Sequence, residues 1–275
     1  MTGGRLPWLL LTPAAVAIVL VLLVPVAIIL GTSVTGEGPF WGRYAEALGD
    51  PFTRGVLWRT LRIAAISTLI AAAIGFPTAY VVARSPAARR SLFIICAVFP
   101  LLTNPVVRSF AWMVILGRNG LANDALLWLG VIGQPMRFLF TEGAAIVGFV
   151  YLFAPLMILS LVGVMESIES DLLDAATSLG ASQIGVFRQV ILPLAVPGLI
   201  VGSVLVFTGS FTAYTTPQLL GGDRNTVLAT LLYQQAMVRF DWAAASTVAA
   251  IMVVLTVAAI LVMNAVARRL NPTAG

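Results

Sequence analysis

The sequence contains no histidine and no lysine, and Cys96 is its only cysteine. Without histidine, the chain cannot form His-based catalytic triads, proton relays or His-dependent metal sites. Without lysine, it cannot form a phosphate-binding loop that ends in Gly-Lys-Ser/Thr, so it cannot bind ATP in that way by itself. A single cysteine also excludes an intrachain disulfide. We therefore predict no catalytic, cofactor or metal site.

Charge is scarce as well. Charged residues make up 10% of the 275 positions, whereas hydrophobic residues make up 60%. A soluble domain carries about 25% charged and roughly 45–50% apolar residues, so this composition requires a bilayer as solvent. The positive charge comes entirely from arginines at the ends of apolar runs. The net charge of +5 therefore indicates membrane topology, and nucleic acid is not expected as a partner.

Six apolar stretches are long enough to cross a bilayer, which needs about 20 residues of helix. The first follows Arg5 and is longer than the core of a typical signal peptide, so we predict that it is retained. The expected fold is an all-α integral membrane protein, one transmembrane domain over 1–275 with about six transmembrane helices. Their predicted ranges are 8–30, 60–83, 92–116, 143–165, 195–216 and 243–266.

Short arginine-rich segments indicate the orientation of these helices. Segment 84–91 holds three arginines and no acid, and the tail holds Arg268 and Arg269. Such segments stay on the cytoplasmic side of the membrane. We therefore predict that both termini, segment 84–91 and loop 166–193 are cytoplasmic.

Loop 166–193 is too polar to lie in lipid, and its pattern predicts two short helices. Ser170 is a candidate N-cap, Gly180 is placed to end the first helix, and Ser182 is placed to cap the second. Apolar residues at helical spacing give the first helix one stripe. A helix lying on the membrane surface is the alternative, but four acids and a single arginine match anionic headgroups poorly. The stripe consists of Leu172, Ala175, Ala176 and Leu179.

A fixed spacing runs through this loop. Asp174-Ala175-Ala176 is followed after three residues by Gly180, and after nine more by Val190-Ile191-Leu192-Pro193. The loop thus resembles the cytoplasmic loop of importer permeases in the ABC transporter family, whose pattern is Glu-Ala-Ala, three residues, Gly, nine residues, Ile, one residue, Leu-Pro. Asp174 replaces Glu and Val190 replaces Ile, and both changes keep charge or hydrophobicity.

The resemblance implies a type I ABC importer permease fold with a cytoplasmic coupling helix. It also implies a second homologous permease subunit, two ATP-binding subunits and an extracytoplasmic solute-binding protein as partners. ATP hydrolysis would then belong to a partner, so this chain is expected not to be an enzyme. The implied ATPase-coupling residues are Asp174, Ala175, Ala176, Leu179, Gly180, Leu192 and Pro193.

Other segments are similar to the spermidine/putrescine permeases, over most of residues 58–270. The resemblance implies a polyamine as the solute and the plasma (inner) membrane of a bacterium as the location. A permease of the same family for an opine or an amino-acid derivative is the alternative. A secondary transporter is disfavoured because the eleven acids fall in loops or at span ends. The similar segments include Pro100–Pro105, Arg108, Ala111-Trp112, Leu219–Gly222 and Asp241-Trp242.

Hydroxyl and aromatic residues suggest where the solute passes. Four of them lie at the outer end of the fifth predicted span and two in the third and fourth spans, where they would line a polar route or stack on an alkyl-ammonium ion. Ordinary helix packing is the alternative explanation for each of them. The candidate pathway residues are Trp112, Tyr151, Phe211, Thr212, Tyr214 and Thr215.

Arg108 lies inside the third predicted span, where a charge is costly unless it is paired or hydrated. We expect a structural ion pair, with Glu142 as the candidate partner. A place in the pathway, or a side chain that extends toward the outer surface, are the alternatives.

Overall fold

The computed structural model describes residues 6–35, 39 and 41–270, which form helices and connecting loops without a β-strand among them. It divides into two compact units. Unit 1 combines the chain up to Arg54 with Leu231–Val254, and unit 2 combines Gly55–Thr230 with the chain from Leu255 onward. The boundaries fall within three helices: α3 (Pro51–Ala83), α11 (Leu228–Tyr233) and α12 (Trp242–Leu270).

Unit 1 begins with α1 (Leu6–Val34), which is apolar on all sides. A helix without a polar face is typical of a membrane span. The short helix α2 (Gly42–Gly49) is tied to the end of α1 through Ser33, whose Oγ lies 2.5 Å from the Tyr44 hydroxyl.

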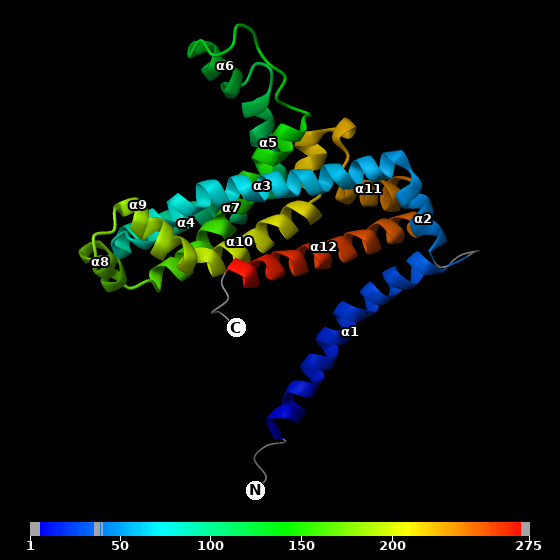
Figure 1. Cartoon of the computed structure of the whole chain (residues 1–275). Coiled ribbons are helices and arrows are strands. Elements are labelled where there is room, and N and C mark those ends of the chain that lie inside the picture. The colour runs from blue at the N-terminus through cyan, green and yellow to red at the C-terminus, as the bar shows by residue number, and fades with distance from the viewer. Residues whose placement is uncertain (1–5, 36–38, 40, 271–275) are drawn as a thin grey trace. The chain divides into compact units, whose positions relative to one another are not determined.

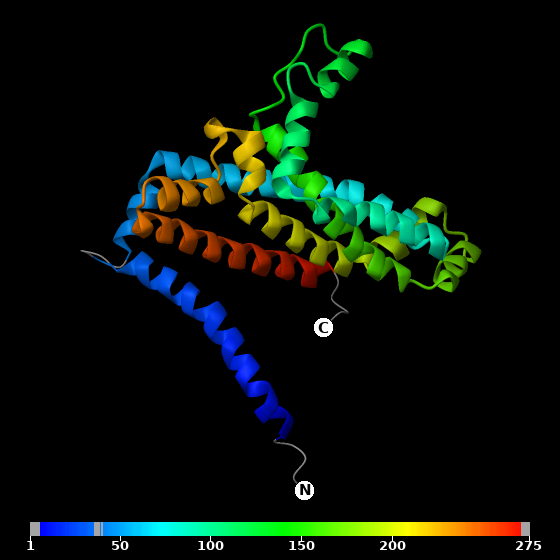
Figure 2. The ribbon, with the colours of Figure 1, turned by 180° about the vertical axis from the view of Figure 1, so that it is seen from behind.

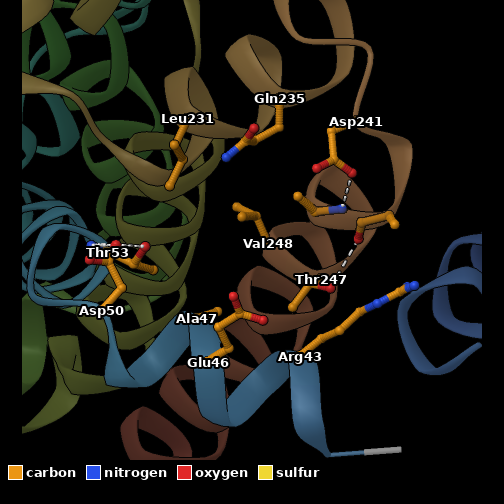
Figure 3. Close-up of a pocket in the computed structure, with 12 residues that line it drawn as sticks. Arg43, Glu46, Ala47, Asp50, Thr53, Leu231, Gln235, Asp241, Thr247 and Val248 are labelled. Carbon is orange, nitrogen blue, oxygen red and sulfur yellow. Dashed lines mark hydrogen bonds between the residues drawn. The ribbon is translucent and has the colours of Figure 1, made fainter. Parts of the chain in front are cut away.

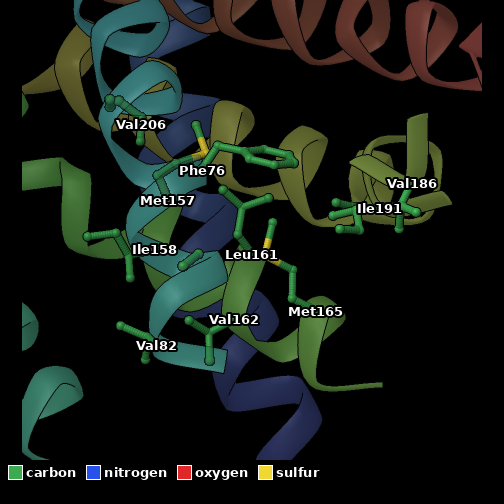
Figure 4. Packing of buried hydrophobic residues seen from close by; sticks show 13 residues of the cluster. Phe76, Val82, Met157, Ile158, Leu161, Val162, Met165, Val186, Ile191 and Val206 are labelled. Atoms are coloured by element: carbon green, nitrogen blue, oxygen red, sulfur yellow. The ribbon is translucent and has the colours of Figure 1, made fainter. Parts of the chain in front are cut away.

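Unit 2 contains α3, α4 (Ala87–Leu102), α7 (Glu142–Glu166) and α10 (Leu192–Thr212), which run side by side (Figures 1 and 2). Helix α7 contacts both α4 and α10. One buried apolar cluster joins α3, α7, α10 and the segment just before α10 (Figure 4). Its larger side chains include Phe76, Val82, Met157, Leu161, Met165, Val186, Ile191 and Val206.

Helices α7 and α10 approach each other closely at three glycines of α10, which are Gly198, Gly202 and Gly209. A Cβ atom on Gly198 would lie 2.8 Å from the Ser160 carbonyl oxygen, and one on Gly202 would lie 2.6 Å from the Met157 sulfur. The Ser160 hydroxyl also donates a hydrogen bond of 2.7 Å to the Gly198 carbonyl. Small residues and interhelical hydrogen bonds of this kind hold membrane helices together. The pair α7–α10 is therefore closely fitted.

The predicted span 92–116 is two helices joined by a sharp bend. Helix α4 ends at Leu102, and the stretch Pro105–Trp128, which begins with α5 (Pro105–Leu116), continues at 98° to it. The Asn104 side chain caps α5 by accepting from the Val106 amide at 2.8 Å. Helices α5 and α6 (Leu121–Trp128) project away from the bundle in both views (Figures 1 and 2). Among the described residues, five helices could cross a membrane, or six if the bent pair counts as one span.

The polar loop between α7 and α10 holds α8 (Ser170–Ser178) and α9 (Gln183–Val186). The second short helix predicted here is not separate, because α9 continues through the π-helical turn Phe187–Ile191 into α10. That long helix ends at Thr212, four residues before the predicted end of the fifth span. The remaining short elements are Pro217–Gly221, Asp223–Asn225 and Gln234–Val238.

The close approach of α7 and α10 can be tested with two glycine-to-alanine changes. Gly198→Ala places a methyl group against a backbone oxygen that cannot move aside, and we expect a cost of about 1–3 kcal/mol. Gly163→Ala in α7 meets no atom within 4 Å and serves as the control. Thermal unfolding of the purified protein in detergent should show a lower Tm for Gly198→Ala alone. Equal Tm values for the two variants would contradict the tight fit.

Candidate functional site

The end of α8 is built around Gly180, as predicted. Its φ is +86°, in the left-handed region that favours glycine. The Gly180 amide donates to the Thr177 carbonyl at 2.9 Å, and the Ala181 amide donates to the Ala176 carbonyl at 3.1 Å. This pair of bonds is the Schellman motif, which satisfies the last carbonyls of a helix. The chain therefore turns sharply at Gly180, and the turn itself pairs the Ala176 and Thr177 carbonyls.

The two predicted N-caps have different outcomes. The prediction for Ser182 is confirmed, because its side chain accepts from the Gly185 amide at 3.2 Å. The prediction for Ser170 is wrong, because the extended cap position belongs to Glu169 and Ser170 is the first helical residue. The start of α8 is thus one residue earlier than the capping pattern indicates.

The apolar residues of α8 divide between two faces. Leu173 and Ala176 pack against the buried cluster of unit 2, so part of the predicted stripe faces the bundle. Leu172 is 49% exposed and Leu179 is 89% exposed. One side of α8 thus holds the helix on the bundle, and the adjoining side leaves Leu179 and about half of Leu172 exposed.

The remaining candidate coupling residues lie at the surface. Asp174 and Ala175 are exposed on α8, and Leu192 and Pro193 are exposed where α10 begins. A cavity of about 380 Å³ lies between α8 and the π-helical turn. Phe187 in that turn packs edge-on against Phe76 of α3, with ring centres 5.5 Å apart. The cavity lining includes Tyr80, Leu173, Thr177, Gln183 and Ile191.

The candidate pathway residues do not form one continuous surface. Trp112 of α5 and Tyr151 of α7 contact each other edge-on, with ring centres 5.5 Å apart. Phe211 is fully buried and stacks on Phe207, so it packs within unit 2 and lines no open route there. Thr212 is exposed at the end of α10. Tyr214 and Thr215 are half-buried beyond it.

The expected ion pair between Arg108 and Glu142 is not present. Glu142 instead binds two arginines of α3: Arg59 Nε at 3.1 Å and Arg62 Nη2 at 2.6 Å. Arg59 also donates to the Thr226 carbonyl at 3.1 Å. This network joins α3, the start of α7 and the segment before α11. This network was not predicted from the sequence, although the spacing of three places Arg59 and Arg62 on one face of α3.

Unit 1 contains a polar cavity of about 520 Å³ between α2, the turn Gln234–Val238 and the start of α12 (Figure 3). Its lining carries three carboxyl groups and one guanidinium. The Thr53 hydroxyl, together with the Thr53 and Phe52 amides, lowers the pKa of one of them, Asp50. That carboxyl group is therefore ionised at neutral pH. The charged lining residues are Arg43, Glu46, Asp50 and Asp241.

Comparison with known proteins identifies the class of this membrane protein. Residues 71–273 match the family described as binding-protein-dependent transport system inner membrane components. The chain belongs to this family. The matched region contains α4 to α11, and with them the loop that carries α8.

Individual family members and structures extend this assignment. The spermidine/putrescine transport system permease protein PotB of Salmonella typhimurium is 35% identical over 199 residues, which are 72% of this chain and 69% of PotB. The molybdenum transport system permease protein ModB of Mycobacterium bovis is 29% identical over 96% of this chain and 95% of its own length. Both are transport system permeases, and neither name describes an enzyme.

The fold comparison agrees with the family. The chain superposes on a bacterial alginate ABC transporter, solved with an alginate pentasaccharide-bound periplasmic protein, with a TM-score of 0.79. The two chains are 18% identical, and the match covers 96% of this chain and 94% of the other. This protein is therefore an inner-membrane permease subunit of an ABC importer, with the type I permease fold.

Proposed function

We propose that the solute of this importer permease is a small polycation of the spermidine/putrescine class. One observation carries the proposal: 35% identity to a spermidine/putrescine permease over 72% of the chain. The cavity of unit 1 supports it, because three carboxyl groups against one guanidinium favour a cation. Trp112 and Tyr151 add aromatic rings that can bind an ammonium group.

The second candidate is another small solute, such as an opine or an amino-acid derivative. The molybdenum transport permease of Mycobacterium bovis, which matches nearly the full length of this chain, shows that the family is not limited to polyamines. Membership of the importer family leaves a secondary transporter without support.

The chain works as one transmembrane domain over 1–275 and provides half of the translocation pathway. Its partners are a second permease subunit, two ATP-binding subunits and an extracytoplasmic solute-binding protein. ATP hydrolysis belongs to the ATP-binding subunits, so this chain is not itself an enzyme. Both termini and segment 84–91 face the cytoplasm, as their arginines indicate, and the α8 loop, two spans after segment 84–91, lies on the same side.

The exposed face of α8 is the contact for an ATP-binding subunit. Leu172 and Leu179 are apolar side chains left in solvent at the end of the bundle, where a partner would bury them. Leu173 and Ala176, on the adjoining side of α8, pack against the buried cluster that also contains residues of α7 and α10. A displacement of α8 toward the bundle is therefore transmitted to α7 and α10, which fit closely together.

The solute is tested with the assembled importer in liposomes. Spermidine or putrescine, presented on the solute-binding protein, should raise the ATPase rate and be taken up when ATP is inside. Liposomes that contain ADP are the control for uptake. Stimulation by a molybdate-loaded or opine-loaded binding protein, with none by polyamines, would contradict the proposed solute.

The coupling role is tested with substitutions that leave the permease core unchanged. Gly180→Val strains the backbone by roughly 1 kcal/mol or more, although its Cβ meets no atom within 4 Å. Leu179→Asp places a charge on a side chain that is 89% exposed, so only a bound partner would be affected. Both should weaken ATPase association or uncouple hydrolysis from uptake. Asp174→Ala, which removes an exposed acid, should have a milder effect.

Two further variants serve as controls. Gly180→Asn keeps a residue that tolerates the left-handed region and should largely retain coupling. Ser178→Asp adds the same charge beside the exposed leucines and should be tolerated better than Leu179→Asp. Wild-type assembly and uptake by both Gly180→Val and Leu179→Asp would show that α8 is not the coupling element.

A further inference from the structure

Arg108 is a buried charge without a carboxylate partner among the described residues. It lies near the start of α5, and 7% of its surface is exposed. The ion pairs found in residues 6–35, 39 and 41–270 involve Arg59, Arg62 and Arg90. A charge at this depth is costly unless the surrounding groups stabilise it.

The guanidinium of Arg108 is stabilised by the end of α4. Its Nη1 donates to the Pro100 carbonyl at 2.9 Å and lies 3.4 Å from the Thr103 carbonyl. These carbonyls have no intrahelical donor, because α4 ends at Leu102. The C-terminal end of a helix also carries partial negative charge, which favours a cation. The end of α4 therefore takes the place of an acidic partner.

The same contacts join α4 and α5 across the bend between them. The backbone supplies few hydrogen bonds at this bend, because Pro105 has no amide hydrogen to donate. The Asn104 side chain caps α5 and the Thr103 hydroxyl caps α4, the latter at 2.8 Å from the Pro100 carbonyl. Neither of these caps reaches from one helix into the other. Arg108 does, since its backbone is in α5 and its guanidinium is on the carbonyls that end α4.

The bend also determines where Trp112 lies. Residues four apart share one face of a helix, so Arg108 and Trp112 lie on the same side of α5. Trp112 packs edge-on against Tyr151 of α7. A change in the angle between α4 and α5 would move Trp112 away from Tyr151.

We propose that Arg108 is a positioning residue of the transport reaction: it fixes the bend between α4 and α5 and thereby holds Trp112 against Tyr151. In this proposal Nη1 of the guanidinium donates to the backbone carbonyls, and the side chain acts through Trp112 and does not bind the solute. The inference rests on the proposed function only for the solute used to measure uptake.

The bend can be measured with spin labels, because Cys96 is the only cysteine and lies exposed on α4. A second label goes on Val114→Cys, at a side chain of α5 that is 71% exposed. Pulsed electron spin resonance then reports the distance between α4 and α5 in the assembled importer, with cysteine-free partner subunits and no solute. Arg108→Met should broaden this distance distribution, and Arg108→Lys, which keeps charge and donors, should retain it. Arg118→Met, at an exposed arginine beyond α5, is the matched control and should also retain it.

Uptake of spermidine gives the second readout. Arg108→Met should raise the KM about tenfold, as expected for the loss of a charged hydrogen bond, and Arg108→Lys should stay near the wild-type value. The maximal ATPase rate should change by less than about twofold, since the coupling loop is not altered. A purely structural defect would instead lower assembly and ATPase rate together.

Several results would overturn the proposal. One is an unchanged distance distribution and KM in Arg108→Met, and another is a defect in Arg108→Lys equal to that of Arg108→Met. If Arg108→Met does not assemble, Arg108→Gln is used in its place. Equal spin-label distance distributions for Arg108→Gln and Arg108→Lys would then contradict the role of the charge. If the wild-type importer takes up no polyamine, the proposed solute fails, while the spin-label distances still decide the role of Arg108.

Discussion

Backbone carbonyls at helix ends need donors, which come from water or the chain at the surface and from the chain alone inside a bilayer. This constraint explains several features of the chain that composition alone does not. At the end of α8, outside the apolar spans, the left-handed Gly180 turns the backbone so that two amides reach the last carbonyls. At the end of α4, the Thr103 hydroxyl and the Arg108 guanidinium supply the donors. Backbone amides donate at the end of α8 and side chains donate at the end of α4, and both satisfy carbonyls that the helix leaves unpaired.

The two solutions suit different tasks. The turn at Gly180 is closed by local backbone bonds, so α8 is a compact unit that can be pushed without losing its own hydrogen bonds. Behind it, the buried cluster and the close approach at Gly198 and Gly202 leave α7 and α10 little room to slide. The bend at α4 depends on one long side chain, and it holds Trp112 against Tyr151 of that rigid pair. The α8 loop and the aromatic contact are thus both connected to α7.

Much of this arrangement could be predicted from the sequence, because apolar runs identify membrane helices and the spacing from Asp174 to Pro193 identifies the loop. The bend in span 92–116 was not predicted as a boundary between two helices, although Asn104-Pro105 marks a break there, because a proline in a membrane helix can also be a kink within one span. The partner of Arg108 was missed for another reason: sequence patterns pair charges with charges, whereas here a helix end takes the acid's place. The burial of Phe211 depends on packing between helices, which hydrophobicity alone does not show.

The central claim is that the exposed face of α8 contacts the ATP-binding subunit. The most direct test is a photo-crosslinking amino acid at Leu179, which is 89% exposed, with the same group at Trp128 of α6, which is 86% exposed, as the control. In the assembled importer, the group at Leu179 should crosslink to the ATP-binding subunit, and the group at Trp128 should not. An assembled, active importer in which Leu179 crosslinks only to lipid or to the solute-binding protein would contradict the claim.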